Sequence, residues 1–256
     1  WSSDVCSSDL IDETYIASSR SIVVTGTHFA KANTAAAQKL AMAYAKRHGG
    51  KIVIDIDYRP NLWGLAGHGA GEERYIRSGD VTAHLQPLLA DCDLIVGTEE
   101  EIMIAGGEDT PFEALKAVRR HSSGTIVMKR GPMGCVVFPG PIPGDLEEGI
   151  KGPGFPVEVY NVLGAGDAFM SGFLRGWLRD EPIATCCAYA NAGGAFAVSR
   201  LLCSAEYPTF DEMQHFITKG AASRAVRHDA ALNHLHWSTT RDAMTSYPKD
   251  DHVYAL

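Results

Sequence analysis

A glycine-rich turn that ends in a carboxylate is the strongest chemical feature of the sequence. Gly164-Ala165-Gly166-Asp167 directly precedes a segment of helical periodicity. Glycines at the start of a helix let backbone N–H groups approach an anion, and the helix dipole favours negative charge there. We therefore predict that these amides hold a phosphate while Asp167 accepts a proton from an attacking hydroxyl, as phosphoryl transfer requires. The simpler interpretation is a turn whose aspartate only caps the helix.

Two acids and an arginine follow the second predicted strand. Asp55, Asp57 and Arg59 lie where this strand meets a loop. The guanidinium fork of arginine suits carboxylates and phosphates. The stretch is therefore a candidate for binding an anionic group, and a solvated loop with surface charge is the alternative.

Three consecutive acids, Glu99-Glu100-Glu101, open the helix expected after the third strand. Acids at this position are often only favourable dipole charges. The alternative is that one of them helps to hold hydrated Mg²⁺ near nucleotide phosphates. The turn-rich loop from Lys129 to Gly134 is compatible with a nucleotide passing close to it, but by itself it is weak evidence.

Composition narrows the class of protein. The chain has 256 residues, of which 45% are apolar, enough for a packed core in roughly one to two domains. The 23 Lys and Arg against 31 Asp and Glu give a net charge of −8, which argues against sequence-independent binding to nucleic acid or anionic membranes. No run of 18 apolar residues is found, so the sequence predicts no membrane span.

The cysteines and histidines carry no further signature. The six cysteines form no C-x-x-C pair and the adjacent Cys186-Cys187 suits packing, so we expect reduced thiols in a cytoplasmic protein without a secretory signal. His234-Leu235-His236 lacks further ligands in pattern, and we expect no metal site there. P-loop, G-x-G-x-x-G, H-E-x-x-H and G-x-S-x-G motifs are all missing from the sequence, which disfavours a Rossmann oxidoreductase.

Strands and helices alternate along the chain, which predicts an α/β fold with a parallel sheet and helices on both faces. Ligands of such sheets bind outside the carboxyl ends of the strands. The predicted strands are Ser21–Gly26 (a buried strand), Lys51–Asp55, Asp93–Gly97, Thr125–Lys129, Cys135–Phe138 and Phe155–Tyr160. The predicted helices are one capped by Asn33 and stopped by Gly49-Gly50, then Val81–Ala90, Glu99–Ala105, Pro111–His121, Phe169–Leu178, Ile183–Ser199 and one from Asp211, capped by Thr209.

Together these segments resemble the ribokinase-type (PfkB) sugar kinases. Asn161–Asp167 is similar to the D-T-x-G-A-G-D signature of the family, and Gly97–Glu100 falls at its N-x-x-E motif. Asp55–Trp63 is similar to the D-x-N-x-R-P-x-L-W stretch of the keto-acid kinases in the family. The likeness runs from about Asp12 to Phe216. Within the family it is greatest to the branch that phosphorylates 5-dehydro-2-deoxygluconate in myo-inositol catabolism, on the evidence of Val24–His28, Asn161–Phe173 and Ser199–Ser204.

The resemblance implies a ribokinase-like fold and ATP-dependent phosphorylation of a primary hydroxyl on a six-carbon deoxy-keto acid, with ATP and Mg²⁺ as cofactors. It implies these site residues: Asp167 as the base; the amides of Gly164, Ala165 and Gly166 as the anion hole; Glu100 acting through hydrated Mg²⁺; Arg59 and Asp57 near the phosphates or the substrate; and Lys129, Gly131, Gly134 and Asn191 near the nucleotide.

Four positions depart from the family pattern. Asn161 and Val162 replace the first Asp and Thr of the signature, which weakens any role for those side chains. Gly97 replaces the Asn of N-x-x-E, and Glu101 stands one residue beyond Glu100, so the register of the acidic residue is open. Asp57 stands where related kinases have Asn, which would change substrate contacts.

The resemblance also implies a domain organisation. We expect residues 1–10 to be a non-native leader and residues 11–220 to form the kinase core. This core would lack an N-terminal portion of roughly 100 residues that carries the lid. Residues 221–256 would be a helical linker and the start of a truncated further domain, and a homo-oligomer is left open.

Two other functions stay open beside the first. One is phosphorylation of 2-keto-3-deoxygluconate or another acid sugar, because the stretch Asp57–Trp63 is shared in kind. The other is nucleotide binding without turnover, since a chain without the lid would lack much of the sugar site.

Overall fold

The computed structural model describes residues 10–66, 75–201, 203–221, 223–229, 232, 235–238 and 243–246. These residues divide into two compact units. The first comprises the chain up to Arg130 together with Val136–Ile150, and the second comprises Gly131–Cys135 and the chain from Lys151 onward. The expected leader before Leu10 and His234 of the His-x-His pair lie outside the described residues.

A parallel sheet forms the centre of the first unit, as predicted. Its strands β1, β2, β3 and β4 are hydrogen-bonded in chain order, each parallel to the next. The sheet continues with β5 and β6 to an order of β1-β2-β3-β4-β5-β6. The bounds are β1 (Ser21–Thr25), β2 (Lys51–Asp55), β3 (Leu94–Thr98), β4 (Thr125–Lys129), β5 (Cys135–Phe138) and β6 (Ile150–Gly152).

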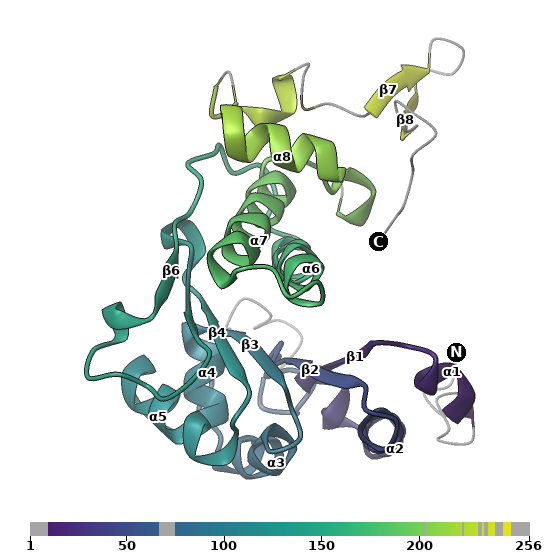
Figure 1. Ribbon diagram of the computed structural model, residues 1–256, viewed down its shortest axis with the longest axis vertical. Helices are drawn as coiled ribbons and strands as arrows, with labels where there is room; N and C mark the ends of the chain where they lie inside the picture. Colours follow the sequence, from purple (N-terminus) through teal and green to yellow (C-terminus); the bar gives the residue numbers. More distant parts are fainter. Residues whose placement is uncertain are drawn as a thin grey trace. The chain divides into compact units, whose positions relative to one another are not determined.

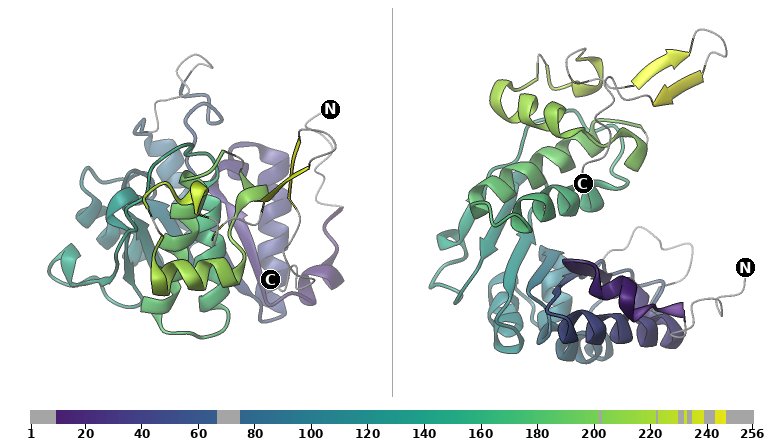
Figure 2. Two further views of the ribbon diagram at one scale, coloured as in Figure 1. Left: turned by 90° about the horizontal axis from the view of Figure 1, so that it is seen from above. Right: turned by 45° about the vertical axis from the view of Figure 1, so that its right-hand side comes forward.

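Helices connect the parallel strands and cover one face of the sheet within the first unit (Figures 1 and 2). Parallel strands in simple chain order with right-handed crossovers place all their helices on the same side. Alternate side chains such as Ile52 and Ile54 of β2 pack there in one core with Leu85 and Val118 of the helices. The helices are α1 (Glu13–Ala17), α2 (Ala32–Arg47), α3 (Gly79–Leu89), α4 (Glu99–Gly106) and α5 (Pro111–His121), with a short 3-10 helix at Gly26–Ala30.

The second unit is mainly helical. It contains α6 (Ala165–Trp177), α7 (Ile183–Val198) and α8 (Phe210–Lys219), and Figure 1 shows α6 and α7 running side by side below α8. The rings of Phe196 and Phe216 meet edge to face in its core, 5.1 Å apart. Two antiparallel strands follow, β7 (Leu235–Ser238) and β8 (Ala243–Ser246).

Several element boundaries agree with the sequence prediction residue for residue, namely those of β2, β4, β5 and α5. The predicted cap of α8 is also confirmed. Thr209 accepts a hydrogen bond from the backbone of Glu212, whose carboxylate reaches back to the amide of Thr209. Gly49, with φ +72°, follows the last turn of α2, as expected for a helix stop.

Three local predictions are wrong. Residues 155–160 form no strand, because their backbone bonds go to single partners in other segments, as Glu158 N does to Arg224 O, rather than to a ladder. The cap of α2 is Lys31, and Asn33 lies inside the first turn, where its side-chain Oδ1 accepts from Thr34 N. β1 is not a buried strand, because it lies at the edge of the sheet and leaves Val23 45% exposed.

Among the described residues, no helix combines the length and apolar character that crossing a membrane requires. The five described cysteines are all free thiols, as expected.

Candidate active site

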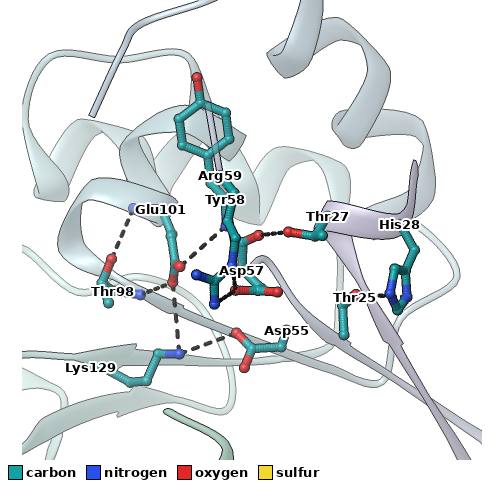
Figure 3. Close-up of polar contacts among 10 residues, drawn as sticks. All are labelled: Thr25, Thr27, His28, Asp55, Asp57, Tyr58, Arg59, Thr98, Glu101 and Lys129. Atoms are coloured by element: carbon teal, nitrogen blue, oxygen red, sulfur yellow. Dashed lines mark hydrogen bonds and ion pairs between the residues drawn. The ribbon is translucent and has the colours of Figure 1, made fainter. Parts of the chain in front are cut away.

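Polar side chains gather at the carboxyl ends of the parallel strands in the first unit (Figure 3). Asp55 ends β2, Thr98 ends β3 and Lys129 ends β4. Thr98 and Lys129 are register partners in the β3–β4 pair. Residues far apart in the sequence therefore meet at one edge, where sheets of this class bind ligands.

Lys129 is the centre of this group. Its ammonium lies 3.2 Å from Asp55 Oδ1 and 3.7 Å from Glu101 Oε2. The three side chains are only 10–15% exposed. Burial raises the pKa of Asp55 to about 6, and the Lys129 charge opposes that rise. Burial alone would lower the pKa of Lys129, but the carboxylates of Asp55 and Glu101 outweigh it and raise that pKa, so the lysine stays charged.

Glu101 contacts residues at or just after the ends of three strands, including Lys129 at the end of β4. Its Oε2 accepts from Thr98 N at 2.6 Å, its Oε1 accepts from Tyr58 N at 3.3 Å, and Thr98 Oγ1 accepts from Glu101 N in return. This is a capping box that starts α4. Glu100, the residue expected to act through Mg²⁺, is exposed on the same first turn. The polar-x-x-Glu spacing thus falls on Thr98 and Glu101 in the structure.

The loop after β2 is held in an uncommon backbone conformation. Asp57 has φ +34°, a region that aspartate and asparagine tolerate better than most residues. The hydroxyl of Thr27 donates to Asp57 O. The Asp57 carboxylate accepts from Arg59 Nε at 3.1 Å and lies 3.0 Å from Nη2. The loop therefore holds the exposed Arg59 guanidinium at the strand ends, where it pairs with Asp57 of the same loop.

The residues expected near the nucleotide fall in different environments. Lys129 belongs to the buried group, whereas Gly131 lies in a short 3-10 helix with open space where a side chain would be. Gly134 has φ +84°, and a Cβ there would lie 1.9 Å from Gly152 O. Asn191 is buried and donates its amide to Gly152 O at 2.9 Å and Pro153 O at 3.1 Å. Gly134 therefore allows a close backbone approach and Asn191 satisfies two backbone carbonyls. Their contacts with a nucleotide stay predictions.

The glycine turn lies in the second unit, at the start of α6. Gly164 is the N-cap residue with φ +77°, and Asp167 lies exposed in the first turn. The amide of Ala165 makes only a long bond, 3.4 Å, to Val162 O. The first N–H groups of a helix have no partner within it. The turn therefore offers backbone donors, the positive end of a 13-residue helix and an exposed carboxylate within one turn.

Two residues of these sites, Thr27 and Thr98, were not predicted from the sequence as site residues. The hydroxyl of Thr27 donates to Asp57 O in the loop after β2, and Thr98 Oγ1 accepts from Glu101 N in the first turn of α4. Thr98 could have been found from its spacing to Glu101, because Thr-x-x-Glu before an apolar run is a capping-box pattern. Thr27 lies in the Val24–His28 stretch that carries part of the resemblance, but no local pattern there predicts its bond to Asp57.

Comparison with known proteins gives the family. The family model described as pfkB family carbohydrate kinase matches residues 6–209. This chain belongs to the PfkB family. The resemblance stated from its motifs is therefore confirmed.

Curated relatives of this PfkB chain share one name. The 5-dehydro-2-deoxygluconokinase of Geobacillus kaustophilus (strain HTA426) is 30% identical over 222 residues, which are 85% of this chain and 61% of that protein. The 5-dehydro-2-deoxygluconokinase of Bacillus subtilis (strain 168) is 29% identical over 212 residues, 81% of this chain and 59% of that one. The chain thus spans about 60% of the length of these relatives.

Solved structures show the same fold. A fructokinase from Vibrio cholerae O395, in its fructose-, ADP- and calcium-bound form, matches with a TM-score of 0.65 at 21% identity, over 81% of this chain and 64% of its own. An aminoimidazole riboside kinase from Salmonella enterica, complexed with aminoimidazole riboside and an ATP analog, matches with a TM-score of 0.62 at 20% identity, over 77% and 62%. The predicted ribokinase-like α/β class is confirmed.

Proposed function

We propose that this PfkB chain carries the phosphoryl-transfer machinery of a sugar-acid kinase. The kinase transfers the γ-phosphoryl group of ATP to the primary hydroxyl of 5-dehydro-2-deoxygluconate in myo-inositol catabolism. The relatives' shared name supports this substrate. The fructokinase and riboside kinase structures, which hold ADP and an ATP analog, support a nucleotide donor.

One observation carries the proposal: an exposed carboxylate one turn into a helix whose N-cap is a left-handed glycine. In the proposed step Asp167 takes the proton of the substrate hydroxyl, whose oxygen attacks the γ-phosphorus. The bond from the γ-phosphorus to the β,γ-bridging oxygen breaks, and ADP leaves. Developing charge on the phosphoryl oxygens is stabilised by the amides of Gly164, Ala165 and Gly166, which need no movement to reach it.

The residues at the strand ends fit the rest of the reaction. Mg²⁺ bound to ATP keeps most of its waters and needs few protein ligands, which the exposed Glu100 can supply through water. The Arg59 fork suits a phosphate or the carboxylate of a sugar acid. The buried Lys129, neutralised by Asp55 and Glu101, is better suited to hold these strand ends than to contact a nucleotide directly.

An assay of ADP formation tests the proposal. The chain is supplied with Mg-ATP and either 5-dehydro-2-deoxygluconate or 2-keto-3-deoxygluconate, and calorimetry measures Mg-ATP binding in parallel. We expect turnover with the first acid, and Asp167→Asn to lower kcat by about 10³ or more with little loss of ATP affinity.

Asp211→Asn is the matched control, because Asp211 is also an exposed acid in the first turn of a helix of the second unit. If both variants behave like the parent chain, Asp167 is only a favourable charge in the first turn of α6. Preference for the second acid would replace the substrate, and binding of Mg-ATP without ADP formation would leave a nucleotide-binding chain without turnover.

A further inference from the structure

Two side chains fasten the glycine turn to the segment that follows α7. Asn161 Nδ2 donates to Leu201 O at 2.8 Å, while its Oδ1 accepts from Leu163 N at 3.1 Å. The hydroxyl of Tyr207 donates to Gly164 O at 2.6 Å. These contacts join residues 40 and 43 positions apart in the sequence, one three residues before the N-cap and one at the N-cap itself.

The turn needs such fastening because burial does not hold it. Val162 and Leu163, just before Gly164, are 58% and 64% exposed. Gly164 itself has φ +77°, and glycine populates many backbone states when nothing restrains it. Without the two side chains, the direction of the first amides of α6 would depend on a glycine-rich, solvent-exposed segment.

The hydroxyl of Tyr207 stays protonated and so can always donate its hydrogen bond to Gly164 O. Burial raises the pKa of its phenol, and the neighbouring Cys203 and Asp167 raise it further, so the hydroxyl keeps its proton. The Sγ of Cys203 lies 3.6 Å from the hydroxyl. A Cβ on Gly164 would lie 2.6 Å from Tyr207 Oη and 2.2 Å from Cys203 Sγ, so the contact leaves no spare room.

Asn161 explains one departure from the family signature. An aspartate there could accept from Leu163 N, but its carboxylate could not donate to Leu201 O. It would instead place two acceptors where the structure has a hydrogen bond of 2.8 Å. The amide of Asn161 can both donate to Leu201 O and accept from Leu163 N.

We infer that Tyr207 and Asn161 are positioning residues that lock the Gly164–Asp167 turn, so that its amides and carboxylate face one phosphoryl group. This inference rests on the proposed function of the turn for its catalytic consequence, but the locking itself does not depend on that function.

Amide hydrogen exchange tests the locking without any substrate. Peptides covering residues 162–168 are compared among the parent chain, Tyr207→Phe, Asn161→Asp and the control Tyr160→Phe. Tyr160 is an exposed tyrosine beside Asn161, and its ring contacts Arg227. Losing one hydrogen bond should speed exchange in these peptides by about three- to ten-fold in the first two variants. Peptides of the α7 core should be unchanged, and so should all peptides of the control.

Kinetics test the consequence. In Tyr207→Phe and Asn161→Asp we expect kcat to fall by about ten-fold while KM for ATP changes less than about three-fold, since misaligned donors cost most in the transition state. Unchanged exchange in residues 162–168 overturns the locking. Faster exchange with unchanged kcat overturns the positioning role. If the parent chain makes no ADP at all, the kinase proposal fails, while the exchange result still decides the locking.

Discussion

The two candidate regions handle negative charge in opposite ways. At the strand ends of the first unit, carboxylates are buried against Lys129 and the charges are satisfied by side chains. At the start of α6, the structure presents backbone amides and an exposed Asp167, with glycine in place of side chains. The first arrangement is closed and the second is open.

This difference indicates a structural role for the buried ion pairs and a chemical role for the open start of α6. A buried ion-paired group resists change, because removing one partner leaves an unpaired charge in a dry site. An open helix start can accept an incoming anion and release it, because its donors are fixed by the helix and its approach is free. We therefore expect the Lys129 group to stabilise the strand ends and the glycine turn to take part in phosphoryl transfer. Four variants test these two roles.

Lys129→Met gives the largest expected effect on stability. It leaves Asp55 and Glu101 buried without their cation, which should lower the free energy of unfolding by about 3–5 kcal/mol. Lys116→Met is the matched control, because Lys116 pairs with Glu113 on the exposed face of α5 and should cost less than about 1 kcal/mol. Urea unfolding followed by tryptophan fluorescence measures both. Equal small losses would show that the buried group does not hold the strand ends.

Gly164→Ala should break the open region. The new Cβ combines a left-handed backbone with contact against Cys203 and Tyr207, so we expect roughly 2 kcal/mol lower stability and about 10²-fold lower kcat/KM. Gly49→Ala, at the stop of α2, has a similar φ, +72°, with nothing within 4 Å of a new Cβ, and should cost only about 1 kcal/mol and leave kcat/KM unchanged. Similar kinetics for the two variants would remove the turn from catalysis.

The pKa of Asp55 predicts a pH dependence in the closed region. Because its folded pKa of about 6 lies above the ordinary aspartate value of 3.8, the folded state binds more protons between these values, so Asp55 makes stability fall as pH rises from about 4 to 6. Asp55→Asn removes this contribution. Its stability relative to the parent should therefore rise by roughly 1–3 kcal/mol between pH 4 and pH 7. Urea titrations at both pH values measure this, and a constant difference would contradict it.

Asp57→Asn is expected to have the smallest effect. Asparagine tolerates the left-handed backbone of position 57, and the ion pair with Arg59 is largely exposed, so stability should change by less than about 0.5 kcal/mol. Release of the guanidinium should lower KM for the sugar acid by up to about five-fold. A raised KM would show that the Asp57 carboxylate contacts the substrate itself.

Local sequence patterns predicted the elements well where a single element carries its own signal. β2, β4 and β5 are short apolar runs, and α5 begins at Pro111 after a Thr cap, so each boundary could be read directly. Phe155–Tyr160 is also rich in aromatic and β-branched residues, yet it forms no strand because no partner strand lies beside it. Strand propensity is expressed only when a neighbour supplies the ladder.

The glycine turn could be predicted from local residues alone, because a site made of backbone amides lies in consecutive positions. Local residues could not predict the Lys129 group or the two fastenings of the turn. Those depend on which strand ends are neighbours, on the register that pairs Thr98 with Lys129, and on contacts 40 or more residues apart. Such contacts form only when packing of the whole unit fixes the strand register and the neighbours of each segment, so they could be found only in the folded structure.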